Sequence, residues 1–249
     1  LTHFINKPNP NGVFVELGAC DGIIYSNTYF FEKILNFKGI LIEPNKDLFK
    51  LLQENKKKHR SNTVCIQKAI STEKDDVLFV SSTKLDNKPC GGIKKYMSND
   101  HINMWFSKNI ETYTVETDTL SSICLQNNIT YIDLFSLDVE GGELEVLHTI
   151  DFTKVEIYVI CIELSNKKGE HEQKCREFLL QKGFTFKQRM TINEFWVNEQ
   201  YSRKDEVYDP NIQISFNGIE KKNRTSNIGS HPFTELNLIN TINQLCKNT

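Results

Sequence analysis

Residues 13–22 read VFVELGACDG, and this short stretch decides the fold class. Residues 13–17 are apolar apart from Glu16, so we predict a strand here, and a turn bracketed by Gly18 and Gly22 follows it. Further β-rich runs alternate with segments of helical periodicity along the rest of the chain. The other predicted strands cover residues 39–43, 63–69, 77–81, 132–139 and 155–164, with a closing antiparallel pair at 184–189 and 194–198. The predicted helices cover about 28–36, 46–57, 119–127, 142–149 and 170–182.

The repeated order of strand, helix and strand predicts an α/β fold with a doubly wound, mostly parallel sheet. The longest apolar run, at 155–164, is expected to be a central strand buried on both faces. We expect one domain over residues 1–200, because a chain of 249 residues suits one such domain with a short appendage. Residues 82–109 form an irregular insert that could act as a lid, and the polar segment 201–249 is an extension of unknown role.

Composition excludes some functions and suggests a compartment. With 30 Lys and Arg against 32 Asp and Glu, the chain lacks the basic excess typical of a nucleic-acid-binding domain, so we expect no nucleic-acid partner. Seven scattered cysteines without a CxxC pair are typical of reduced thiols, which predicts a cytoplasmic protein. No apolar stretch approaches the roughly 18 residues of a membrane span, and the first ten residues lack the features of a signal peptide. Oligomeric state is not indicated.

The turn after the first predicted strand carries acidic residues where a phosphate-binding loop would carry glycines. It matches neither GxGxxG nor GxxxxGK[ST], and Glu16 and Asp21 would repel a pyrophosphate, so an NAD-dependent dehydrogenase is disfavoured. Glu43 ends the next predicted strand, where an acidic residue typically accepts hydrogen bonds from ribose hydroxyls. A nucleoside with a cationic, phosphate-free tail fits this pattern, and S-adenosylmethionine is such a nucleoside.

Two linked motifs resemble those of the FkbM-type methyltransferases. The first covers residues 13–45, with VELGACDG, SNT, FE and GILIEPN in order, and the second is IDLFSLDVEGGELEVL at 132–147. Thr119-Leu120 between them resembles the family's short Thr-Leu-Asp element, although Ser121 replaces the aspartate. The resemblance covers about residues 12–198, and it implies a class I, Rossmann-like fold, S-adenosylmethionine as the methyl donor and, in most members, O-methylation of sugars or sugar-bearing products.

The resemblance also implies a role for individual residues. It assigns to the methionine part of the donor the residues Glu16, Gly18, Asp21 and Gly22, with Ala19 and Asn27 of the same segment as further donor contacts. Glu43 is assigned to the ribose, with Pro44 and Asn45 beside it. The loop that borders the adenine is matched by Ala69, Ile70 and Ser71. Asp138 and Glu140 fall where the family places acidic groups facing the transfer site, so Asp138 is expected to border the donor as well.

A sugar hydroxyl is a poor nucleophile until its proton is removed, so the acceptor side requires a general base or a metal ion. Asp138 is our first candidate base, because it ends a buried strand and desolvation there would raise its pKa. Glu140 and Glu163 are further catalytic candidates, and with Asp138 they could bind a divalent metal through oxygen ligands. His171 is an alternative base, although a solvated position at the start of a helix fits it equally well. Glu143 is assigned to the first turn of a helix, with Glu145.

The sequence therefore predicts an S-adenosylmethionine-dependent O-methyltransferase acting on a sugar or glycoconjugate. Two alternatives stay open: a methyltransferase for a protein, lipid or small metabolite, and a module that keeps the fold without turnover. Aromatic residues of the insert, including Trp105, could stack on a sugar ring or simply pack a small core. For His101, in the same insert, the sequence offers no argument.

Overall fold

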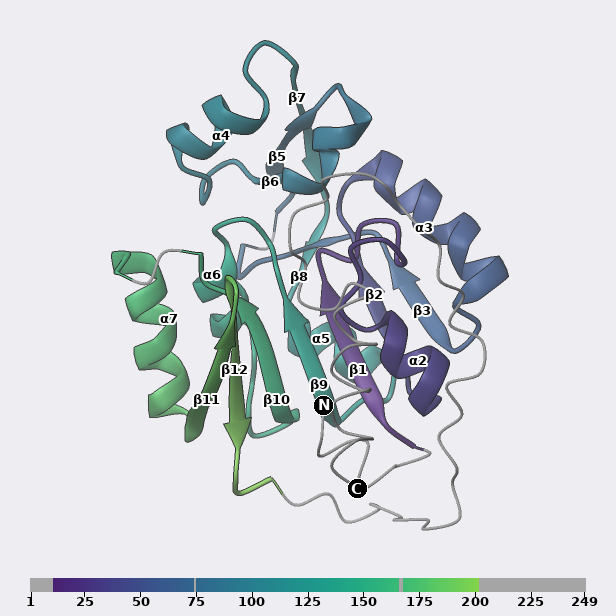
Figure 1. Ribbon diagram of the computed structural model, residues 1–249, viewed down its shortest axis with the longest axis vertical. Coiled ribbons are helices and arrows are strands. Elements are labelled where there is room, and N and C mark those ends of the chain that lie inside the picture. Colours follow the sequence, from purple (N-terminus) through teal and green to yellow (C-terminus); the bar gives the residue numbers. More distant parts are fainter. Residues whose placement is uncertain (1–10, 74, 166–167, 202–249) are drawn as a thin grey trace, which may run out of the picture.

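A central sheet of seven strands organises the computed structural model, which describes residues 11–73, 75–165 and 168–201. The strand order is β11-β12-β10-β9-β1-β2-β3 (Figure 1). The strands are β1 (Val13–Leu17), β2 (Lys38–Ile42), β3 (Thr63–Ile66), β9 (Tyr131–Leu137), β10 (Glu156–Glu163), β11 (Phe184–Met190) and β12 (Asn193–Asn198). Within this sheet, the five strands β10, β9, β1, β2 and β3 run parallel, and β12 is antiparallel to both of its neighbours, β10 and β11. The sheet is thus the doubly wound, Rossmann-like α/β architecture predicted from the sequence, including its antiparallel closing strand.

Helices cover both faces of this sheet, because its central strands are apolar on both sides. On one face, α2 (Tyr29–Leu35) and α3 (Lys46–His59) pack with strand residues such as Phe14 and Leu41. On the other face lie α5 (Leu120–Gln126), α6 (Glu143–His148) and α7 (Glu170–Gln181), which pack around a core that includes Phe135 and Ile160. The two cores fix the strands in register and bring their carboxyl ends to one edge.

A cap stands above that edge, and we use the word for residues 71–116 (Figure 1). The cap contains a three-stranded antiparallel sheet of β5 (Val77–Ser82), β6 (Gly92–Ile93) and β7 (Ile110–Val115), together with η1 (Leu85–Cys90) and α4 (Asn99–Trp105). It joins the body through a short parallel pair, β4 (Ala69–Ile70) and β8 (Thr117–Asp118). The buried Lys88 also fixes it to α3, since its ammonium pairs with Asp47 at 2.8 Å and with Glu111.

Two sequence-based expectations differ from this structure. The third strand, predicted as one element over 63–69, is divided, because the backbone leaves the sheet after Ile66 and Ala69 then donates to the Glu116 carbonyl at 2.9 Å. The insert predicted as irregular over 82–109 is larger and more ordered, since β5 and β7 pair on either side of it. Within the described ranges, no helix has the length and apolarity needed to cross a membrane, and the six described cysteines form no disulfide.

Candidate functional site

The carboxyl ends of β1, β2 and β9 meet the underside of the cap at a cavity of about 190 Å³. Ligands of open α/β sheets bind at this edge, where the order of winding reverses. Seven of the residues selected from the sequence line the cavity, namely Gly18, Glu43, Pro44, Ala69, Ile70, Asp138 and Glu140. The cap contributes the stretch from Pro89 to Ile93. The cavity therefore has one wall of acidic strand ends and one wall of cap residues.

Nine selected residues are not among those that line the cavity, namely Glu16, Ala19, Asp21, Gly22, Asn27, Asn45, Ser71, Glu163 and His171. Several of them instead hold, through hydrogen bonds, the backbone segments that line the cavity. Asp21 accepts hydrogen bonds from the amides of Ile23 at 2.9 Å and Ile24 at 2.8 Å, so its carboxylate closes the turn. Asn45 caps α3 by accepting from the amides of Asp47 and Leu48. Direct donor contact by the first seven of these residues, and a catalytic role for Glu163 and His171, stay predictions.

Gly18 allows the first turn to pass very close to β9. Its φ is +73°, and a Cβ added there would lie 2.0 Å from the carbonyl oxygen of Asp138. Only glycine tolerates both the left-handed conformation and this approach. The result is a cavity floor made of backbone, with the amides of Gly18 and Ala19 turned back to the Ile42 carbonyl at 3.2 Å each.

Glu43 presents a buried carboxylate at the end of β2, with 4% of its surface exposed. Its Oε2 accepts from the Cys20 amide at 2.8 Å, and its Oε1 accepts from the Asn45 amide at 2.7 Å. Burial raises the pKa of Glu43 to about 7, while the two amide hydrogen bonds favour the charged form and limit that rise. Each oxygen keeps a lone pair, so the carboxylate can accept two further hydrogen bonds from a bound diol.

Glu16 lies just below the turn and is almost completely buried, at 1% exposure. It accepts from Ser26 Oγ at 2.7 Å, Thr28 Oγ1 at 2.6 Å and the Asn27 amide at 2.5 Å. The side chain of Asn27 donates through Nδ2 to Ser136 Oγ at 2.8 Å, but its buried Oδ1 has no hydrogen-bond partner among the described residues. A buried acceptor without a donor costs free energy, so a ligand group that donates there would be favoured.

Asp138 and Glu163 are hydrogen-bonded to each other through their carboxyl groups, so one of the two must carry the proton between them. Burial and the nearby charge of Glu163 raise the pKa of Asp138 well above its ordinary value. Burial, together with the charge of Glu140, raises the pKa of Glu163 to about 7. Two hydrogen-bonded carboxyl groups titrate as a pair, so together they can hold and pass a proton.

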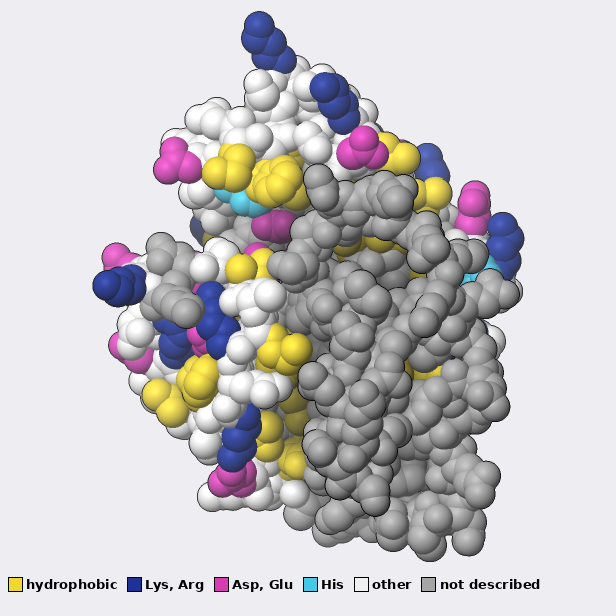
Figure 2. Space-filling view, in the orientation of Figure 1, with side chains coloured by type: hydrophobic (Ala, Val, Ile, Leu, Met, Phe, Trp, Pro, Cys, Tyr) yellow, Lys and Arg dark blue, Asp and Glu magenta, His cyan; other side chains and the backbone are white. Residues whose placement is uncertain are grey.

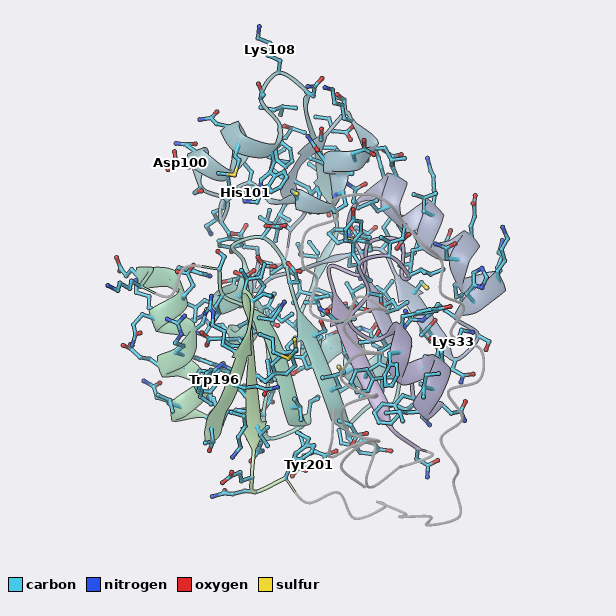
Figure 3. All side chains as sticks on the ribbon, viewed as in Figure 1. Lys33, Asp100, His101, Lys108, Trp196 and Tyr201 are labelled. Atoms are coloured by element: carbon cyan, nitrogen blue, oxygen red, sulfur yellow. The ribbon has the colours of Figure 1, made fainter. Side chains whose placement is uncertain are left out.

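Glu140 turns into the cavity from a strained backbone position, with φ of +58°. Burial and the charge of Asp138 raise its pKa well above the ordinary value. Its Oε2 lies 3.7 Å from Nδ1 of His101, which extends from α4 of the cap. The other ring nitrogen of His101 lies 3.0 Å from the Cys90 carbonyl. Figure 3 labels His101 on the part of the cap nearest the sheet, and Figure 2 shows histidine and acidic side chains between cap and body.

His171 is placed away from the cavity and pairs with Glu143 at 3.1 Å. Hydrogen bonding to Glu143 raises the pKa of His171, although partial burial opposes the rise. Glu143 in turn accepts from the amides of Val139 at 3.3 Å and Gly141 at 3.1 Å, so it supports the 138–142 turn at the start of α6. No group of three or more His, Cys, Asp or Glu in the described part of the chain is arranged to hold a metal ion. We therefore derive no step through a metal.

Sequence reasoning did not select several residues that line the cavity, including Cys20, Tyr25, Lys68 and Cys90, nor His101 behind Cys90. Tyr25 follows the glycine turn, and Lys68 directly precedes the predicted adenine loop, so their positions in the chain carried a usable signal. For Cys90 and His101 the sequence carried no such signal, because their positions relative to the cavity depend on how the cap folds over the end of β9.

Residues 16–186 match the family described as the methyltransferase FkbM domain. The chain belongs to that family. No curated protein is significantly similar to this FkbM family member.

Among solved structures, a methyltransferase FkbM from Methylobacillus flagellatus KT is 11% identical, with a TM-score of 0.45, and the match covers 76% of this chain and 44% of that one. This chain thus spans less than half the length of that relative. The METTL16 MTase domain is 12% identical over 75% of this chain and 59% of its own, with a TM-score of 0.43. TrmK of M. capricolum, solved with S-adenosyl-homocysteine, is 8% identical over 82% and 69%, with a TM-score of 0.38.

Proposed function

We propose that this FkbM family member is an S-adenosylmethionine-dependent O-methyltransferase that acts on a hydroxyl of a sugar or glycoconjugate. The observation that carries the proposal is the cavity, which is lined by the buried carboxylate of Glu43 after β2 and by Asp138 after β9, on the two sides of β1. Asp138 is in turn hydrogen-bonded to Glu163. One group suits a ribose, and the other suits an acceptor whose proton must be removed.

The residues present fit the methyl donor. Glu43 has free lone pairs for a ribose diol. The acidic strand ends would also favour a cationic ligand. When bound, S-adenosylmethionine supplies an electrophilic methyl group on a sulfonium, and much of the acceleration then comes from how the acceptor is held.

On the acceptor side, Asp138 is the proposed catalytic residue and Glu163 its proton relay. As Asp138 takes the proton of the acceptor hydroxyl, its own proton passes along their hydrogen bond to Glu163. Burial and the charge of Glu140 raise the pKa of Glu163, so Glu163 accepts this proton only after it has itself ionised as pH rises. Glu140 and the cap residue His101 border the same space and complete the acceptor side. A module without turnover would have no use for a carboxyl pair arranged in this way.

The first test is calorimetry of the purified protein with S-adenosylhomocysteine. We expect binding, and a folded protein that does not bind would refute the proposal. The second test follows labelled methyl transfer from S-adenosylmethionine to separate panels of glycans, proteins, lipids and RNA. Transfer to a glycan is expected, and transfer to another panel alone would replace the sugar with that acceptor.

Asp138→Asn separates the two halves of the site. We expect it to keep the affinity for S-adenosylhomocysteine and to lower turnover by about 100-fold or more, the range that general-base catalysis supplies. Unchanged turnover would remove Asp138 from the chemistry. Weakened S-adenosylhomocysteine binding would instead place Asp138 on the donor side.

A further inference from the structure

A buried polar cluster lies behind the first turn, on the side away from the cavity. The Arg60 network, as we call it, consists of Glu16, Ser26, Thr28, Glu32 and Arg60, all of them at most 5% exposed. We propose that Arg60 is a positioning residue that sets the affinity for the methyl donor by holding the loop of residues 18–28 in its binding shape. This inference rests on the proposed function, because it concerns the donor side of the same cavity.

The guanidinium of Arg60 uses all three of its nitrogens. Nε pairs with Glu32, Nη1 donates to the Gly22 carbonyl at 2.6 Å and to Ser26 Oγ at 2.9 Å, and Nη2 donates to Thr28 Oγ1 at 2.9 Å. Aromatic rings pack near it, with its Cζ 5.4 Å from the Phe14 ring centroid and 5.5 Å from that of Tyr29. A planar fork of donors can fix several acceptors at once, which a lysine ammonium on a flexible stem cannot reproduce.

The hydroxyls of Ser26 and Thr28 pass this anchoring on to β1. Each accepts from Arg60 and donates to Glu16 Oε2, at 2.7 Å from Ser26 and 2.6 Å from Thr28. Arg60, at the end of α3, is therefore joined through these two hydroxyls of the loop to Glu16 near the end of β1. Regular helix or strand is absent from the described residues 18–28, so side-chain hydrogen bonds must supply the order that backbone ladders supply elsewhere.

The loop held in this way forms part of the cavity wall. Gly18, Cys20 and Tyr25 line the cavity, and the neighbouring Asn27 carries the unpaired buried Oδ1. Asn27 is fixed between the network and the sheet, since its amide donates to Glu16 Oε1 and its side chain donates to Ser136. Loosening the network would let the wall adopt several shapes, and donor binding would then have to select one of them.

Stability alone does not explain such a cluster. Buried ion pairs add little to the free energy of unfolding compared with apolar residues of similar volume, because desolvation offsets their attraction. The network also contains two carboxylates for one guanidinium, and burial is the largest influence on Glu16, whose pKa is raised despite the nearby charge of Arg60. Placement of the loop is a better account of the cluster than packing is.

The test compares isosteric and conservative variants by calorimetry with S-adenosylhomocysteine, at a temperature well below their unfolding transitions. Thr28→Val removes one hydroxyl without changing the volume, and we expect it to weaken binding about 10- to 100-fold, because Arg60 Nη2 loses its acceptor and Glu16 Oε2 loses one of its two hydroxyl donors. Thr28→Ser keeps the hydroxyl and should bind like wild type. Arg60→Lys should weaken binding as Thr28→Val does, because it keeps the charge and loses the fork.

Arg176→Met is the matched control, since Arg176 pairs with the buried Glu194 at 3.0 Å in a part of the sheet remote from this loop. It should lower the melting temperature and leave binding unchanged. Hydrogen exchange of the residue 18–28 amides should rise in Thr28→Val and stay unchanged in Arg176→Met. Wild-type protein that fails to bind overturns the proposed function together with this inference. Wild-type binding that Thr28→Val and Arg60→Lys leave intact overturns the inference alone.

Discussion

Glu43→Gln tests the electrostatics of the donor side without requiring any ligand. Burial raises the pKa of Glu43 from 4.5 to about 7, so the folded protein holds this proton more tightly than the unfolded chain does. The favourable contribution of the protonated form is complete below pH 4.5 and is lost as pH rises through 7. Each tenfold change in proton affinity is worth about 1.4 kcal/mol, so ionising Glu43 in the folded protein costs about 3 kcal/mol.

Glutamine at position 43 does not ionise, so Glu43→Gln does not lose the stability that wild type loses when Glu43 ionises. Between pH 5 and pH 8 we expect the free energy of unfolding of wild type to fall by about 2.5 kcal/mol relative to Glu43→Gln. The glutamine NH₂ also faces a backbone amide that the carboxylate oxygen had accepted, which lowers stability by about 1–3 kcal/mol at every pH. This loss is the same at every pH, so it does not change how the free energy of unfolding depends on pH.

Urea denaturation followed by circular dichroism at several pH values provides the measurement. Other buried acids, including Asp138 and Glu163, titrate in both proteins, so the difference between the two curves isolates Glu43. Glu54→Gln is the matched control, because it makes the same change at an exposed position on α3 and should follow wild type. Parallel curves for wild type and Glu43→Gln would refute the reasoning.

Two further predictions concern the backbone of the first turn and the pair outside the cavity. Gly18→Ala should lower the free energy of unfolding by about 3 kcal/mol or more, because a Cβ there meets the Asp138 carbonyl at 2.0 Å. Gly183 has a similar φ of +84°, but a Cβ there meets nothing within 4 Å. Gly183→Ala should therefore lower the free energy of unfolding by only about 1–2 kcal/mol in the same chemical denaturation assay. His171 has a raised pKa, so its pairing with Glu143 stabilises the fold below its ordinary pKa of 6.5, and that contribution is lost as pH rises through the folded value. Wild type should therefore exceed His171→Gln in melting temperature at pH 6 and lose that advantage at higher pH, and a constant difference would contradict the assignment.

The sequence predicted the strands whose patterns are local. Residues 13–17 form β1 with the expected bounds, while Glu43 and Asp138, predicted to lie at the ends of strands, directly follow β2 and β9. Parallel strands in a doubly wound sheet then bring those acids to one edge, which is why their common position could be predicted from the strand pattern, with the family resemblance adding their proposed roles.

The direction of each side chain could not be inferred in the same way. Glu16 lies at the end of β1 but turns toward Ser26 and Thr28, because the two faces of a strand alternate and the loop then folds over the face that Glu16 occupies. His101 reaches Glu140 only through the tertiary fold of the cap, where the buried Lys88 and the pairing of β5 with β7 fix α4. Contacts between residues so distant in sequence leave no periodic signal.

The short parallel pair of β4 and β8, through which the cap joins the body, affects how the sequence of such a protein can vary. The chain leaves the body at Ile70 and returns beside it at Asp118, in direct register with each other. The backbone of the segment between these residues therefore enters and leaves at one place, outside the hydrogen-bond ladder of the seven-stranded sheet, although side chains such as Lys88 also contact the body. Insertions, deletions or an exchange of the whole intervening segment would leave that ladder intact. If the proposed function holds, the cap side of the cavity can therefore diversify in evolution, or by grafting, while the strand ends on its other side stay the same.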